Sequence, residues 1–134
     1  MKKDILKPEV KNVTIAITLS QNTNDADEWR VYLINNNSLA IENTLVASTG
    51  YGKQGGEKQK TSTLRHFLET VKANSTAQVE IIQPEVFHLN NEYFVSYYMD
   101  GLLYDKRFTF VPDSISKKNL TFIKELNSKG ILHS

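Results

Sequence analysis

The stretch that decides the fold, residues 91–111, reads NEYFVSYYMDGLLYDKRFTFV. Aromatic and β-branched residues favour strands, and they lie here on both sides of Asp100-Gly101. Asp-Gly favours a two-residue turn, because both central residues of a type I′ turn need positive φ. The stretch therefore predicts a β-hairpin in which Met99 lies opposite Leu102 and Tyr97 opposite Tyr104.

This register assigns each side chain of the hairpin to one of two faces. The face expected to be buried carries Tyr93, Val95, Tyr97, Met99, Leu102, Tyr104, Phe108 and Phe110. Lys106 also falls on that face, so we expect it near a sheet edge, with its ammonium reaching solvent. The opposite face combines apolar and charged side chains, namely Phe94, Tyr98, Leu103, Asp105 and Arg107.

The Phe-Tyr-Leu cluster on the second face is larger than scattered apolar exposure requires. Two interpretations remain open. The carboxy-terminal segment covers the cluster through Leu120, Phe122 and Ile123, or the cluster is a surface for a protein partner or a homodimer. Tyrosine beside arginine is typical of interface hot spots and supports the second interpretation.

The remaining chain is a succession of short strands separated by polar turns. The expected strands are 13–19, 29–34, 42–49, 61–71 and 76–82. With the hairpin they predict an all-β, antiparallel two-sheet sandwich of about seven strands in a single domain, 1–134. Residues 1–9 are expected to be a flexible segment, and residues 112–134 a carboxy-terminal extension with a short helix near 114–126.

The amino-acid composition excludes or disfavours several classes of function. The 134 residues carry a net charge of +1, so a strongly basic nucleic-acid binder is disfavoured. The chain contains no cysteine, which excludes disulfides, thiol catalysis and cysteine-ligated zinc. No leader-like apolar run follows Lys2-Lys3 and no stretch could span a membrane, so we expect a protein that binds neither nucleic acid nor membrane. We expect it to be cytoplasmic, or secreted if a leader has been removed.

Residues 29–111 resemble the immunoglobulin-like adhesion and interaction modules. Residues 31–36, VYLINN, followed by Thr44-Leu45-Val46, are similar to the second and third strands of that family. Residues 71–79, VKANSTAQV, resemble its L-x-x-G-x-x-x-x-V corner, with Asn74 where glycine is usual. The Cys…Trp…Cys signature of antibody domains is absent. The resemblance implies an immunoglobulin-like sandwich that acts in protein interaction.

A second resemblance is to short bacterial proteins, some of which are labelled phenylalanyl-tRNA synthetase alpha subunit. It rests on Tyr51-Gly52, residues 60–66, residues 103–106 and residues 129–132. No residues match a synthetase catalytic core. The resemblance therefore implies an accessory protein without catalytic activity.

The glycine-rich stretch from Gly50 contains the pattern G-x-G-x-x-G, which in dinucleotide folds lies between a strand and a helix. No helix is expected after it here, so we predict a flexible loop that binds neither ATP nor NAD. A weak anion site remains an interpretation for its backbone amides and lysines, involving Gly50, Gly52, Lys53, Gly55 and Gly56.

Other chemistry-bearing residues are scattered. His66, His88 and His133 lack partners at a recognised metal spacing, and Asp25, Asp27 and Glu28 lack the EF-hand pattern. Serine, histidine and aspartate are present, but no motif positions a serine as a nucleophile. We therefore expect no catalytic, cofactor or metal residues.

The sequence thus favours a non-enzymatic immunoglobulin-like module for protein–protein interaction or assembly. One alternative is a sandwich that binds a small ligand or carbohydrate through Trp29, Tyr51 or other exposed aromatic residues beside the glycine loop. Another is the synthetase-labelled accessory protein.

Overall fold

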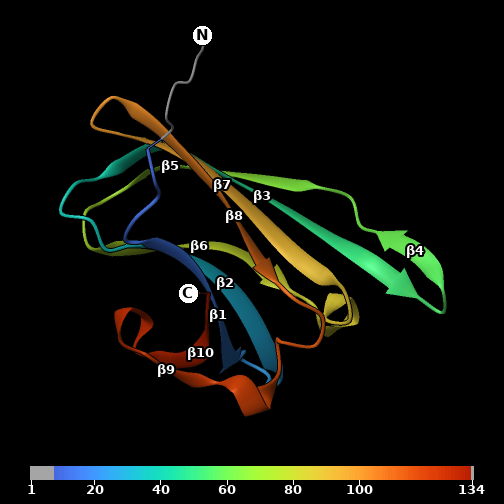
Figure 1. The fold of residues 1–134 in the computed structure, drawn as a ribbon. Coiled ribbons are helices and arrows are strands. Elements are labelled where there is room, and N and C mark those ends of the chain that lie inside the picture. The colour runs from blue at the N-terminus through green and yellow to red at the C-terminus, as the bar shows by residue number, and fades with distance from the viewer. Residues whose placement is uncertain (1–7, 134) are drawn as a thin grey trace, which may run out of the picture.

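The computed structural model describes residues 8–133, which form two antiparallel β-sheets packed on one another (Figure 1). Sheet A consists, in spatial order, of β6 (Ser75–Ile82), β2 (Asp27–Asn35), β1 (Val13–Gln21), β10 (Ser128–Leu132) and β9 (Thr121–Ile123). Sheet B consists of β4 (Glu57–Lys60), β3 (Ile41–Gln54), β7 (Asn90–Met99) and β8 (Leu102–Phe110), and β5 (Leu64–Val71) also pairs with β3. The predicted all-β sandwich is confirmed, and residues 8–133 contain ten strands rather than about seven.

The β7–β8 hairpin has the register predicted from Asp100-Gly101. Met99 pairs with Leu102 and Tyr97 with Tyr104, and both turn residues have positive φ, 53° and 79°. β8 pairs only with β7 among the described strands, so it is an edge strand. Lys106 is exposed on this edge, with its ammonium 5.0 Å from the centre of the Phe108 ring, as expected for a cation at a sheet border.

The inner faces of both sheets form one hydrophobic core. Side chains from the hairpin meet side chains from β1 and β2, and the fully buried members include Ile15, Ile17, Val31, Leu33, Tyr93, Val95, Tyr97 and Phe108. Each large apolar side chain buried in this way contributes about 1.5–3 kcal/mol. The core therefore holds the hairpin's inner face firmly and directs its other face outward.

β3 is long because it changes partner along one side. Its first half pairs with β5 and its end pairs with β4, while β7 pairs along the other side. The stretch predicted to be a flexible glycine loop is thus a β-hairpin, β3–β4. Gly55 and Gly56 form its turn with φ of 60° and 85°, a conformation that glycine adopts without strain.

The carboxy-terminal residues add two strands to sheet A. The predicted helix near 114–126 is wrong, because β9 lies there between two 3₁₀ turns, Lys117–Asn119 and Lys124–Leu126, and no α-helix occurs in residues 8–133. Asn119, Thr121 and Phe122 are weak helix formers, whereas pairing with β10 satisfies the backbone groups of β9. The segment 1–9 that we expected to be flexible lies outside the described residues, except for Pro8 and Glu9.

Candidate functional site

The outer face of sheet B gathers exposed apolar side chains from four strands. β5 supplies Phe67, which the sequence did not associate with this face, and its side chain is 61% exposed. Tyr98 and Leu103 are 41% and 44% exposed. The half-buried members are Leu45, Ala47 and Phe94. We call these six residues the sheet B apolar cluster.

Strand register explains why these residues meet. Phe67 pairs with Leu45, and Leu45 pairs on its other side with Ser96, which lies opposite Asp105. The next row runs from Arg65 through Ala47 and Phe94 to Arg107 in the same way. The structure therefore brings together all five predicted surface residues, Phe94, Tyr98, Leu103, Asp105 and Arg107, and adds Arg65 and Phe67.

Arg107 organises the polar part of this face. Its guanidinium lies 5.0 Å from the centre of the Phe94 ring, and its Nε lies 3.4 Å from Oε2 of Glu92. A cation over an aromatic face is attracted to the ring and also shields it from water. Arginine, aromatic side chains and a charged rim are the mixture found at protein–protein hot spots.

The carboxy-terminal segment does not cover this cluster. Ile123 and Leu126 pack instead on Ala16 and Ile34, which lie on the outer face of sheet A. Phe122 is itself 63% exposed. The interpretation that the segment covers Phe94, Tyr98 and Leu103 is therefore incorrect.

The β3–β4 hairpin places the predicted anion-site residues in regular strands and a turn. The amide of Gly50 donates to Thr61 Oγ1 over 2.8 Å, and Gly52 pairs with Gln59. Lys53 lies directly opposite Lys58, and Tyr51 opposite Lys60. Anion binding by Gly50, Gly52, Lys53, Gly55 and Gly56 stays a prediction.

A second polar cluster, which the sequence did not predict, surrounds Glu80 between the sheets. Ser48 Oγ donates to Glu80 Oε1 over 2.8 Å, His66 Nε2 lies 2.6 Å from the same oxygen, and Tyr93 donates to Oε2 over 3.0 Å. Burial, followed by the charge of Glu80, raises the pKa of the Tyr93 hydroxyl well above its ordinary value. The four residues join β3, β5 and β7 of sheet B to β6 of sheet A.

A β-bulge explains why sequence analysis missed Glu80. Simple alternation along β6 would place Ala77, Val79 and Ile81 inward. Val31 pairs with Glu80 while Tyr32 pairs with Gln78, so Val79 is an extra residue and the alternation shifts. Glu80 consequently faces inward, and Ile81 is 46% exposed.

A cavity of about 210 Å³ lies beside this cluster, lined by Glu80, Tyr93, Ser48 and apolar residues such as Ile82 and Val86. His66 contacts Glu80 rather than Ser48, so the histidine is not placed to take a proton from the serine hydroxyl. The cluster works as a polar connection between the sheets, and the cavity offers room for a small molecule.

The two other histidines each contact another side chain. His88 Nε2 lies 2.7 Å from Gln59 Oε1, and the His133 ring packs edge-on against Phe108 and Phe110. Within the described part of the chain, no group of three or more His, Cys, Asp or Glu residues is arranged to hold a metal ion.

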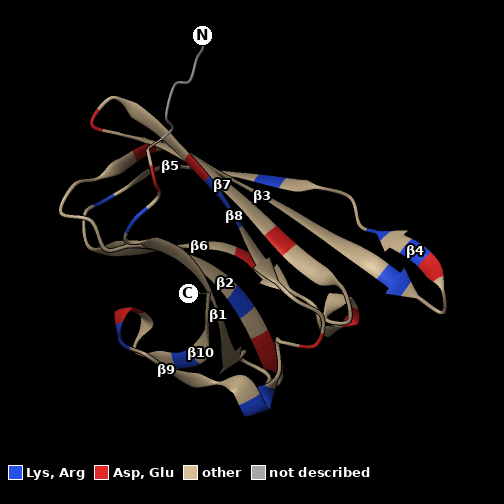
Figure 2. Cartoon of the chain, in the orientation of Figure 1, with Lys and Arg blue, Asp and Glu red and all other residues tan. Residues whose placement is uncertain are grey.

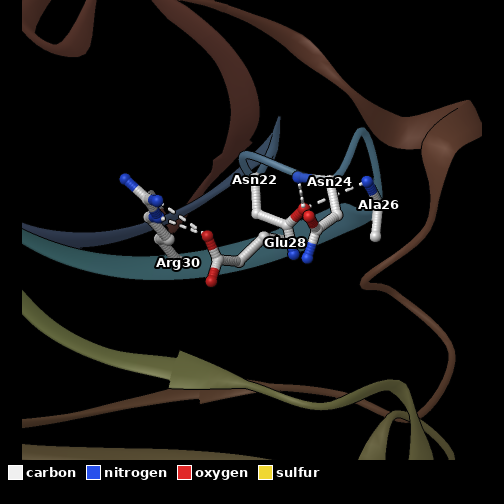
Figure 3. A network of polar contacts seen from close by, with 5 residues as sticks. All are labelled: Asn22, Asn24, Ala26, Glu28 and Arg30. Carbon is white, nitrogen blue, oxygen red and sulfur yellow. Dashed lines mark hydrogen bonds and ion pairs between the residues drawn. The ribbon is translucent and has the colours of Figure 1, made fainter.

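The predicted acidic loop is tied to neighbouring groups (Figure 3). Asn22 Oδ1 accepts hydrogen bonds from the amides of Asn24 and Ala26, which closes the β1–β2 turn. Glu28 forms an ion pair with Arg30 over 2.7 Å, and Asp27 with Lys117 over 2.8 Å. Two of the three acidic side chains considered for calcium thus have cationic partners.

Comparison of the chain with protein-family models, curated proteins and solved structures found no match. Residues 8–133 contain no helix with the length and apolar character needed to cross a membrane.

Proposed function

We propose that the chain is a non-enzymatic, immunoglobulin-like module that binds another protein molecule through the outer face of sheet B. The strand order supports the immunoglobulin-like part of this proposal. β1, β2 and β6 are consecutive in sheet A, and β3, β7 and β8 are consecutive in sheet B. Immunoglobulin sandwiches place their strands A, B and E in one sheet and C, F and G in the other, in these same orders.

The observation that carries the binding function is the uncovered sheet B apolar cluster with its charged border. Leaving Phe67, Tyr98 and Leu103 in water forgoes about 1.5–3 kcal/mol for each side chain that a partner would bury. Arg65, Arg107, Glu92 and Asp105 are suited to orient that partner.

Two matched phenylalanines provide the test. Phe67 lies on sheet B and is 61% exposed, whereas Phe122 lies on β9 of sheet A and is 63% exposed. Immobilised wild-type chain and the immobilised Phe122→Ser variant should both retain the same protein, either from a lysate of the source cells or, for self-binding, from a solution of the chain itself. Phe67→Ser should lose it. Equal retention by all three chains would contradict the proposal.

A second candidate function, small-ligand binding, rests on the cavity beside Glu80. The cavity lies next to Gly50, near the glycine-rich stretch that suggested this alternative. Trp29 is only 6% exposed and does not present its ring to a ligand, whereas Tyr51 is 38% exposed. NMR titration with monosaccharides and disaccharides should shift the signals of Ser48 and Tyr93 in the wild type and not in Glu80→Gln. Shifts confined to other residues would exclude this cavity.

A further inference from the structure

We propose that the partner of the sheet B outer face is a second copy of this chain, related by a two-fold axis that lies in the face and runs across its strands. This inference rests on the proposed function and specifies its partner.

One end of the face is basic. Lys53 and Lys58 lie directly opposite one another on the β3–β4 hairpin, and Lys60 lies opposite Tyr51 on the same side. All three lysines are exposed, and none forms an ion pair within residues 8–133. Like charges directly opposite each other destabilise a strand pair, so this end gains from a nearby negative charge.

The other end of the face is acidic. Glu42 pairs with Tyr98 and so shares its side of the sheet. Asp100 occupies the tip of the β7–β8 hairpin, whereas Asp105 lies further along β8, opposite Ser96 and level with Leu45. Figure 2 shows the two ends apart, with the blue segments of β3 and β4 far from the red tip of the β7–β8 hairpin. The apolar cluster lies between the basic end and the hairpin tip.

A two-fold axis across the strands reverses the strand direction of the second copy. It therefore places the basic end of each copy over the acidic end of the other. Asp105 and Arg107 are neighbours on one side of β8, so an axis passing between them sets each Arg107 against the second copy's Asp105. An axis along the strands would instead place lysines over lysines. The axis across the strands therefore makes the face complementary to itself, as a two-fold homodimer requires.

The size of the face suits a stable dimer. Four strands about 4.8 Å apart and about twelve residues along β3, at about 3.3 Å each, give a face of about 760 Å². Standard protein–protein interfaces bury about 800 Å² per partner. Because the apolar cluster is central and the charges are peripheral, the face also has the usual arrangement of an apolar centre and a polar border.

Two other occupants fit less well. An acidic peptide or a single-stranded nucleic acid would bind the lysines of the basic end. Each would then meet Glu92, Asp105 and Glu42 where it crosses the apolar cluster. A second copy is the partner whose charges match both ends.

Charge exchange at positions 105 and 107 tests the proposed orientation. Sedimentation equilibrium of the full chain, from micromolar to millimolar concentration, should show a monomer–dimer equilibrium. Arg107→Asp and Asp105→Arg should each weaken dimerisation about tenfold or more, because a like-charge contact then occurs twice in the dimer. The double variant should return to within about threefold of wild type, since the opposite charges again face one another. A double variant as weak as the single ones would overturn the orientation.

Lys58→Glu and Lys118→Glu provide a matched pair. Both lysines are exposed, but Lys118 lies in the 3₁₀ turn that leads into β9 of sheet A. Lys58→Glu should weaken the dimer about tenfold, and Lys118→Glu should leave it unchanged. Added salt should weaken the wild-type dimer because it screens the contacts between the ends. Equal effects of the two variants would overturn the proposal.

The result also separates this inference from the proposed function. A wild-type chain that stays monomeric at millimolar concentration, while Phe67→Ser still abolishes retention of a different protein, would refute the homodimer and keep the binding module. Binding of the monomer to polyglutamate or to a single-stranded oligonucleotide would refute the homodimer in favour of that occupant. A dimer that resists every substitution on the face would refute the inference by placing the interface elsewhere.

Discussion

The two sheets differ in what lies on their outer faces. On sheet A, Ile123 and Leu126 cover Ala16 and Ile34, so the chain supplies the cover itself. On sheet B, Phe67, Tyr98 and Leu103 remain in solvent. The difference follows from hydrogen bonding, because β10 pairs with β1 and carries the carboxy-terminal segment to sheet A. The carboxy-terminal segment thus covers one face of the sandwich, and the other face stays available for contact with another molecule.

The largest expected effect is loss of the cover on sheet A. Ile123→Ala should lower the free energy of unfolding by about 2–4 kcal/mol, because Ile123 is 3% exposed and its removal leaves a cavity. Urea denaturation measures the change. The adjacent Phe122→Ala should cost less than about 0.5 kcal/mol, the usual limit for a surface position. Similar losses in the two variants would mean that the segment does not cover this face.

A smaller loss of stability is expected from a substitution at Gly130, where β10 closely approaches β1. A Cβ at position 130 would lie 2.6 Å from the carbonyl oxygen of Ile17 and 2.9 Å from Ile123 Cδ1. Gly130→Ala should therefore destabilise the chain by about 1–3 kcal/mol, because backbone atoms must move apart. Gly52→Ala is the control, since its Cβ would meet mainly the Leu89 side chain at 3.2 Å. If Gly130→Ala unfolds at the wild-type urea concentration, the close approach is incorrect.

The adjacent pair Tyr97 and Tyr98 extends the comparison to the two faces of one strand. Burial, followed by the neighbouring Tyr104, raises the pKa of Tyr97 from 10.0 to about 12. Between these values the unfolded chain loses a proton that the folded chain keeps, so stability falls as pH rises from about 10 to 12. The loss is at most about 1.4 kcal/mol per pH unit for one tyrosine. Urea denaturation of Tyr97→Phe in this range should show a shallower decline, and parallel declines would contradict the prediction.

The smallest loss of stability is expected from a substitution on the uncovered outer face of sheet B. Tyr98→Ala should lower the free energy of unfolding by less than about 0.5 kcal/mol in dilute solution, because Tyr98 is 41% exposed and Ile123 and Leu126 pack on sheet A instead. The same variant should weaken self-association at high concentration. A loss of several kcal/mol in dilute solution would show that the chain covers this face after all.

Local signals in the sequence were enough to predict the β7–β8 hairpin. Asp100-Gly101 determines its turn, and alternation then predicts both the buried Tyr97 and the outward Tyr98. The same reasoning predicted the exposed edge position of Lys106. These features depend on neighbours within one pair of strands, which is why a single sequence contains them.

The features that the sequence did not predict depend on distant pairings. Phe67 joins the outer face because β5 pairs with β3, and the inward position of Glu80 depends on a bulge at Val79. The carboxy-terminal segment was misassigned because Leu120, Ile123 and Leu126 have helical spacing. Pairing with β10 overrides that spacing, and no local pattern reports such a pairing.

The pairing of β1 with β10 also sets an order of events in time. Ile17 must find Ile131, more than a hundred positions later in the chain. During synthesis β1 and β2 can pair early, but the edge that β10 will occupy stays open until residues 128–132 have been made. Pairings of such long range are slow to form, so refolding should take milliseconds to seconds rather than microseconds. In that interval Ala16 and Ile34 are exposed beside an unpaired strand, the condition in which β-proteins aggregate or exchange strands between molecules.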